Sequence, residues 1–142
     1  MTRRNLVLVI ALLLVIPVVL VGCGSNGSKK DESTAVKASI NGFADAYASG
    51  NYETCAGYLT ETTDATKDTI IQELSAFHQI TPEIQVDSID NVTVEGSTAT
   101  ADVTVTVLSK QATVKMTLSK SDDTWKFSIA DLLAEVQKQL GA

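Results

Sequence analysis

The spacing of apolar residues changes from a helical period to a strand period near Pro82. Before it, apolar residues recur every three or four positions, as in Val36, Ile40, Phe43 and Tyr47, which predicts amphipathic helices. The predicted helices cover about residues 33–49, 52–59 and 64–79. After it, apolar and polar residues alternate, which predicts half-buried strands. The predicted strands cover residues 84–94, 99–107, 114–118 and 125–129, and a last helix covers residues 130–140.

Local signals set the ends of these elements. Gly50 is a typical helix stop, Asn51 can cap the helix that follows, and Pro82 prevents continuation of the third helix. The first strand is expected to be irregular over residues 88–90. Because helices come first and strands second, the pattern predicts an α+β domain. Its N-terminal helices pack on the apolar face of an antiparallel sheet of about four strands. The last helix could plug the domain, cover a sheet edge or mediate pairing with another chain.

The N-terminus has the pattern of an export leader. Arg3 and Arg4 precede an uncharged apolar run over residues 6–22. The run ends in Leu-Val-Gly-Cys over residues 20–23, which resembles the bacterial lipoprotein signal. That resemblance implies that the Cys23 sulfur takes a diacylglyceryl group and that the leader, residues 1–22, is removed. The alternative is an uncleaved membrane anchor, since the run is close to the length that spans a bilayer.

We therefore expect an extracytoplasmic protein, lipid-anchored to the cell membrane, or to the outer membrane of a cell that has two. Residues 23–32 would form the lipidated cysteine and a polar, flexible tether. Residues 33–142 are long enough for a single domain with its own core.

Charge and cysteine content exclude several functions. Both arginines lie in the leader, which leaves nine lysines against all 17 acidic residues, a formal charge of −8. Such a chain is a poor nucleic-acid binder, because phosphate contacts need cations. Only Cys55 remains once Cys23 is lipidated, so no internal disulfide is expected and Cys55 should be a small buried hydrophobe. No paired cysteine spacing indicates a metal site, and no motif indicates a cofactor.

Three segments carry a resemblance to a known superfamily. They are an opening helix that ends in a Gly-Asn step (residues 43–53), a hairpin (residues 92–99) and an aromatic late strand (residues 124–127). This order of elements is similar to the cone-shaped α+β superfamily that includes nuclear transport factor two, ketosteroid isomerase and many small bacterial lipoproteins. The resemblance implies a curved sheet whose helices enclose a pocket. That pocket is catalytic in some members, binds ligands or partners in others, and is plain core in many.

Few residues are candidates for chemistry in such a pocket. Asp45 lies opposite the apolar stripe of the first helix and is excluded as a pocket base. His78, Asp90 and Tyr47 could form a proton-transfer group, with Asp90 facing inward if its strand keeps its register. The simpler interpretations are a histidine that satisfies carbonyls at a helix end, a bend or bulge at Asp90, and a core tyrosine with its hydroxyl at the rim. The pocket aspartate and tyrosine donor of the isomerases are not matched, so their activity does not carry over.

A ligand-binding function would use the apolar interior. The side chains that would line an open cone are Phe43, Tyr47, Met116, Trp125 and Phe127, although a closed core has the same composition. We therefore expect a non-enzymatic binding or accessory role, with either an envelope protein partner or a small apolar ligand, and a homodimer is one form the partner could take. The alternative is a small hydrolase-like or isomerase-like enzyme that uses His78, Asp90 and Tyr47.

Overall fold

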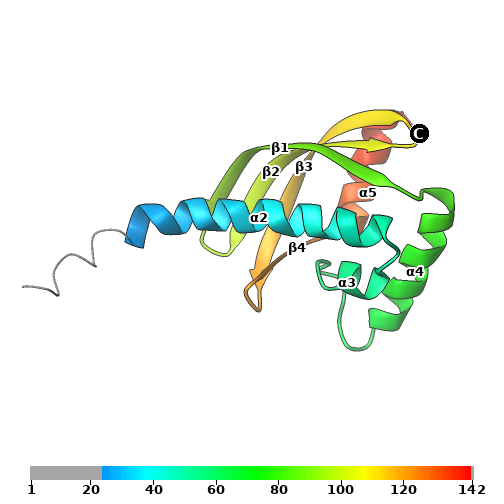
Figure 1. Ribbon diagram of the computed structural model, residues 1–142, viewed down its shortest axis with the longest axis horizontal. Coiled ribbons are helices and arrows are strands. Elements are labelled where there is room, and N and C mark those ends of the chain that lie inside the picture. The colour runs from blue at the N-terminus through cyan, green and yellow to red at the C-terminus, as the bar shows by residue number, and fades with distance from the viewer. Residues whose placement is uncertain (1–23, 142) are drawn as a thin grey trace, which may run out of the picture. The chain divides into compact units, whose positions relative to one another are not determined.

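The computed structural model describes residues 24–141, so the predicted leader and the predicted acylation site at Cys23 lie outside the described residues. Contacts divide the chain into residues 1–31 and residues 32–142, and the architecture below is that of the second unit. Eight helices and strands follow one another along the described chain (Figure 1). They are α2 (Gly24–Ala48), α3 (Tyr52–Ala56), α4 (Lys67–Ile80), β1 (Ile84–Glu95), β2 (Thr98–Val107), β3 (Lys110–Ser121), β4 (Thr124–Phe127) and α5 (Ile129–Leu140).

The four strands form one curved antiparallel sheet in the order β1-β2-β3-β4, and α2 crosses one of its faces (Figure 1). Eight residues of β2 and β3 that alternate toward this face are buried: Ala99, Ala101, Val103, Val105, Ala112, Val114, Met116 and Leu118. Their neighbours on the other face are mostly Thr, Lys and Asp and are half-buried or exposed. The predicted α+β class and the single apolar face of the sheet are confirmed.

Strand β1 slips twice against β2. The register shifts between Val86 and Ser88 and again between Asp90 and Thr93. The first slip reverses the alternation, so that Ile89 pairs with Val103 and is buried. A bulge of this kind adds one unpaired residue to one strand and turns the following side chains to the other face. The strand is therefore irregular, as predicted, but the slips flank residues 88–90, which pair in continuous register with residues 102–104.

Helix α2 begins nine residues earlier than the sequence pattern predicts. Residues 24–32, expected as a flexible coil, belong to the helix. No proline interrupts this stretch, and Lys29, Lys30 and Glu32 are good helix formers. Glu32 is also held by tertiary contacts described below, which a pattern of apolar residues cannot reveal.

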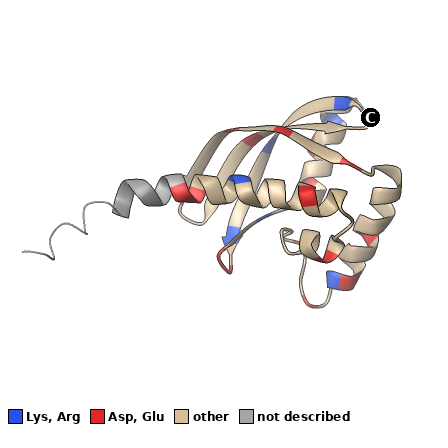
Figure 2. Cartoon of the chain, viewed as in Figure 1, with Lys and Arg blue, Asp and Glu red and all other residues tan. Residues whose placement is uncertain are grey.

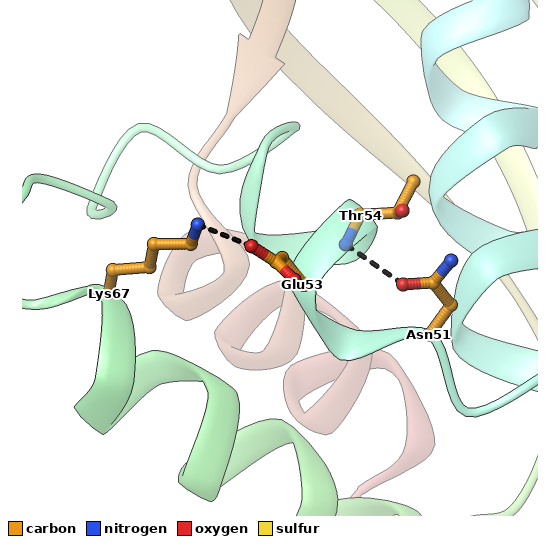
Figure 3. A network of polar contacts seen from close by, with 4 residues as sticks. All are labelled: Asn51, Glu53, Thr54 and Lys67. Atoms are coloured by element: carbon orange, nitrogen blue, oxygen red, sulfur yellow. Dashed lines mark hydrogen bonds and ion pairs between the residues drawn. The ribbon is translucent and has the colours of Figure 1, made fainter.

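The short helix α3 is held by a capping hydrogen bond and an ion pair in its first turn and by strand pairing after its last residue. The Asn51 side chain accepts a hydrogen bond from the Thr54 amide at 3.2 Å, as its predicted capping role requires, and Lys67 of α4 pairs with Glu53 at 2.7 Å (Figure 3). The helix ends at Ala56 instead of Leu59, because the following residues pair with β4. The Phe127 amide donates to the Tyr58 carbonyl, and the Thr60 amide donates to the Phe127 carbonyl, both at 3.0 Å. This short segment pairs with part of the β4 edge.

Helix α5 covers an edge of the sheet and closes the domain. Strand β4 pairs only with residues 118–121 of β3, so the rest of that β3 edge has no strand beside it. α5 packs there and buries Leu132 and Val136 in the core. Covering an edge with a helix prevents pairing with another chain. Ser128 caps the helix by accepting from the Asp131 amide at 3.1 Å, which is why β4 ends before the predicted residue 129.

Glu61, in the loop before α4, joins that loop to the start of α5 through hydrogen bonds. Its carboxylate accepts hydrogen bonds from the Ser128 hydroxyl at 2.6 Å and from the Ala130 amide at 3.3 Å. Partial burial raises the pKa of Glu61, but the bonds from Ser128, Ala130, Thr60 and its own backbone amide lower it more, and the net pKa is below its usual value. The charged carboxylate is thus the form that the fold favours.

The hydrogen bonds to the Glu61 carboxylate should make the stability of the domain fall at acidic pH. A carboxyl with a lowered pKa in the folded state stabilises the fold above its unfolded pKa, and this contribution is lost as the pH falls through the folded value. We therefore expect Glu61→Gln to lower the melting temperature at pH 7, with the difference from wild type shrinking below about pH 4.5. Thermal melts between pH 7 and pH 3 measure it, with Glu83→Gln at an exposed carboxylate as the control. A difference that stays constant with pH would contradict a role for the Glu61 charge.

Candidate functional site

The interior of the cone is filled by its own side chains. The five predicted lining residues, Phe43, Tyr47, Met116, Trp125 and Phe127, are each at most 5% exposed. The hollow beside three of them, Phe43, Met116 and Phe127, measures about 10 Å³, roughly what one water molecule needs. Phe43 packs edge-on against Phe127 with ring centroids 5.1 Å apart. The interior is therefore a closed core in this conformation, which is the simpler of the two interpretations of these residues.

Tyr47 is structural in its contacts. It is completely buried, and its hydroxyl donates a hydrogen bond of 2.6 Å to the Thr81 carbonyl. Burial raises the pKa of Tyr47 to about 12. The interpretation as a core residue is confirmed, but the hydroxyl lies inside the domain and not at the rim. Since the hydroxyl proton is committed to Thr81, Tyr47 is poorly placed to donate to a substrate.

His78 lies on the last turns of α4 beside two tyrosines. Its ring centroid is 5.0 Å from that of Tyr47 and 5.6 Å from that of Tyr52. Its Nδ1 atom is buried and has no hydrogen-bond partner among the described residues. The simpler interpretation expected His78 to hydrogen-bond a carbonyl at the helix end, and Nδ1 makes no such bond within the part of the chain that the structure describes. The packing contacts in the structure are with aromatic rings.

Asp90 does not join this group. The first β1 bulge turns Ile89 inward, so Asp90 faces the outer side of the sheet, opposite Asp102. It is exposed, and it accepts a hydrogen bond from the Ser88 hydroxyl at 2.8 Å. The inward orientation expected from an unbroken register is wrong, and the bend or bulge interpretation is right. Of the three candidates for proton transfer, the structure brings together only Tyr47 and His78.

Cys55 and Asp45 lie as the sequence predicts. Cys55 is completely buried, with its sulfur 3.7 Å from the Phe43 carbonyl, and burial raises the pKa of its thiol to about 11. A thiol in this state is a poor nucleophile. Asp45 is exposed on α2.

A polar cluster that the sequence pattern does not reveal lies around Glu32, the first residue of the second unit. The Glu32 carboxylate pairs with Lys120 at 2.6 Å and accepts a 3.0 Å hydrogen bond from the indole of Trp125. Lys120 also lies 5.9 Å from the centre of the Trp125 ring. The ion pair with Lys120, and then the bond from Trp125, lower the pKa of Glu32. The cluster joins α2 to β3 and β4, and its parts are about 90 residues apart in the sequence.

The larger apolar hollows lie outside the filled interior, beside α5. One of about 220 Å³ lies between α4 and α5, and another of about 160 Å³ lies between α5 and the ends of β1 and β2. Leu133 and Phe77 contribute to both. The sequence gives one signal for this site, the apolar helix predicted after the last strand, over residues 130–140. Helical period alone could not say where that helix would pack.

Charged groups gather into no metal site among the described residues. Figure 2 shows lysines at separate places on the helices and the sheet, with acidic residues among them. No helix within residues 24–141 is long and apolar enough to span a membrane.

Comparison with known proteins identifies the fold alone. No protein-family model and no curated protein matches the chain. Among solved structures, the chain is similar to a variant of Rv3472, a protein of unknown function from Mycobacterium tuberculosis. The identity is 16%, the match covers 75% of this chain and 73% of that one, and the TM-score is 0.56.

A second similar structure is a variant of the designed protein Rd1NTF2_05, with 13% identity, 69% of this chain and 95% of that chain covered, and a TM-score of 0.50. A third is an NTF2-like transpeptidase, named as putative, from Campylobacter jejuni. It is 19% identical, covers 70% of this chain and 97% of that one, and has a TM-score of 0.40. The likeness to the designed protein Rd1NTF2_05 shows that the described domain has the NTF2-like fold, as the resemblance to nuclear transport factor two predicts.

Proposed function

We propose that this protein is an extracytoplasmic lipoprotein, anchored through Cys23, whose NTF2-like domain has a binding role and no catalytic one. The observation that supports an extracytoplasmic location is the Leu-Val-Gly-Cys sequence, which ends an apolar run preceded by two arginines. Two or more acyl chains on one cysteine make a stable membrane anchor, whereas a single chain gives only marginal membrane binding. The domain would then work at a membrane surface.

The absence of catalysis is supported by where the candidate residues lie. The Tyr47 hydroxyl is bonded to a backbone carbonyl, Asp90 is on the outer face of the sheet, and Cys55 is a buried thiol. The interior of the cone leaves room for about one water molecule and not for a substrate. The two hollows beside α5 are lined mainly by apolar side chains, which suits binding better than proton transfer.

The anchor is tested by Cys23→Ser in a bacterium grown with an alkyne-bearing fatty acid. We expect wild type to be labelled, shortened by the leader and found in the membrane fraction. The variant should remain unlabelled and keep its leader. The matched control is Cys55→Ala, which changes the other cysteine and should leave labelling and cleavage unchanged. Normal cleavage of Cys23→Ser would contradict the proposal, and an unlabelled wild type that keeps its leader would indicate an uncleaved membrane anchor instead.

A further inference from the structure

Helices α4 and α5 do not pack tightly along their whole length. The hollow between them, about 220 Å³, is walled by Ile70, Leu74, Phe77, Ile129 and Leu133, with Glu73 as its charged member. The second hollow, about 160 Å³, continues on the other side of Phe77 and Leu133 toward Ile84, Val105 and Val136. Because the same two side chains stand in both walls, the hollows adjoin. We call them together the α5 cavity.

The size of the α5 cavity limits what it can hold. Pockets for drug-sized ligands measure about 300–1,000 Å³, and each hollow here is smaller. A drug-sized ring system would not fit in either hollow, whereas a slender, flexible chain can follow two small hollows in succession. The walls are made of aliphatic and aromatic side chains, so the occupant gains by leaving water only if it is itself apolar.

The charged side chain beside the cavity limits which head group the polar end of such a chain can carry. Glu73 is an exposed residue of α4 that lines the larger hollow, and the only other polar lining residue is Gln137 in the smaller one. An anionic head group beside Glu73 would be repelled, while a neutral or cationic head group would not.

We propose that the α5 cavity binds one aliphatic chain whose polar end, at Glu73, is neutral or cationic. The chain lies between Phe77 and Leu133, with α5 as one wall. This inference rests on the proposed function, because a domain held at a membrane surface is surrounded by molecules with aliphatic chains. It goes beyond that function by naming the site, the class of ligand and the residue that selects the head group.

The test uses the full chain in nanodiscs of phosphatidylcholine and three photoreactive ligands. The ligands carry the same twelve-carbon chain with a diazirine and end in an amine, a hydroxyl or a carboxylate. After irradiation, mass spectrometry locates the labelled residues. We expect the amine and the alcohol to label α4 and α5 at the cavity wall. The carboxylate should label them about two- to fivefold less, the range expected for one exposed charge.

Two neighbouring residues of α5 supply the variant and its control. Leu133→Glu places a charge in the cavity wall and should abolish labelling there, whereas Ala134→Glu places the same charge on an exposed position and should not. Because a charge at position 133 can also loosen α5, Leu133→Trp is made in parallel to fill the cavity with apolar atoms, and both variants are checked by thermal melting. Glu73→Gln should raise labelling by the carboxylate to that of the alcohol.

Labelling that survives both Leu133 variants, or that falls outside α4, α5 and the adjoining strand ends, would overturn the proposal. So would equal labelling by all three head groups in wild type. These outcomes are separate from the anchor experiment: a normally acylated protein with an unlabelled cavity contradicts only the α5 cavity, and an unacylated protein contradicts only the membrane address.

Discussion

Trp125→Ala should lower the free energy of unfolding by about 3–5 kcal/mol, the usual cost of emptying a large buried aromatic site. Trp125 is 1% exposed, and its indole N–H is bonded to Glu32. The substitution leaves a cavity and also takes one of two partners from the Glu32 carboxylate. Since domains are stable by only about 5–15 kcal/mol, much of the fold's stability would be lost.

Urea denaturation followed by far-ultraviolet circular dichroism measures this effect, because the substitution removes the chain's one tryptophan as a fluorescent reporter. Trp125→Phe keeps most of the apolar volume and loses the bond to Glu32, so its loss of stability should be clearly smaller. Lys126→Ala, at the next and partly exposed position of β4, controls for changes in the strand itself. A midpoint of Trp125→Ala close to that of wild type would show that the core at this end tolerates a void.

Tyr47→Phe should cost about 1–3 kcal/mol although only one oxygen atom is removed. The Thr81 carbonyl that accepts from this hydroxyl belongs to a residue only 3% exposed, and the substitution leaves that carbonyl without its tyrosine partner. Tyr47→Ala should cost about 3–5 kcal/mol, since it adds a cavity to the unpaired carbonyl.

The same denaturation experiment compares these variants with Tyr52→Phe. Tyr52 belongs to the same aromatic group around His78 but is half-buried, so loss of its hydroxyl should change stability little. Equal effects of Tyr47→Phe and Tyr52→Phe would refute the particular role of the Tyr47–Thr81 bond in joining α2 to the segment between α4 and β1.

The elements that follow from local physics were predictable. Alternation along residues 99–107 reflects the geometry of a strand, in which successive side chains point to opposite faces, and every predicted inward residue up to Val105 is buried. The helical stripe of Val36, Ile40, Phe43 and Tyr47 is likewise buried. The α+β class follows from the order of these elements, whereas the NTF2-like fold was implied by the resemblance of three segments to a known superfamily. The burial of Cys55 was predicted from its residue type and its helical surroundings.

The side chains that decide chemistry were less predictable, because their positions depend on pairing between distant segments. Asp90 faces outward only because β1 slips against β2, and no residue of β1 alone signals the first slip. The partner of the Tyr47 hydroxyl is a carbonyl 34 residues away, and Glu32 meets residues about 90 positions later. The hollows beside α5 lie where α5 meets α4 and the ends of β1 and β2, which are distant in the sequence. Periodicity records which side of an element is apolar, whereas these contacts arise only when whole elements pack against one another.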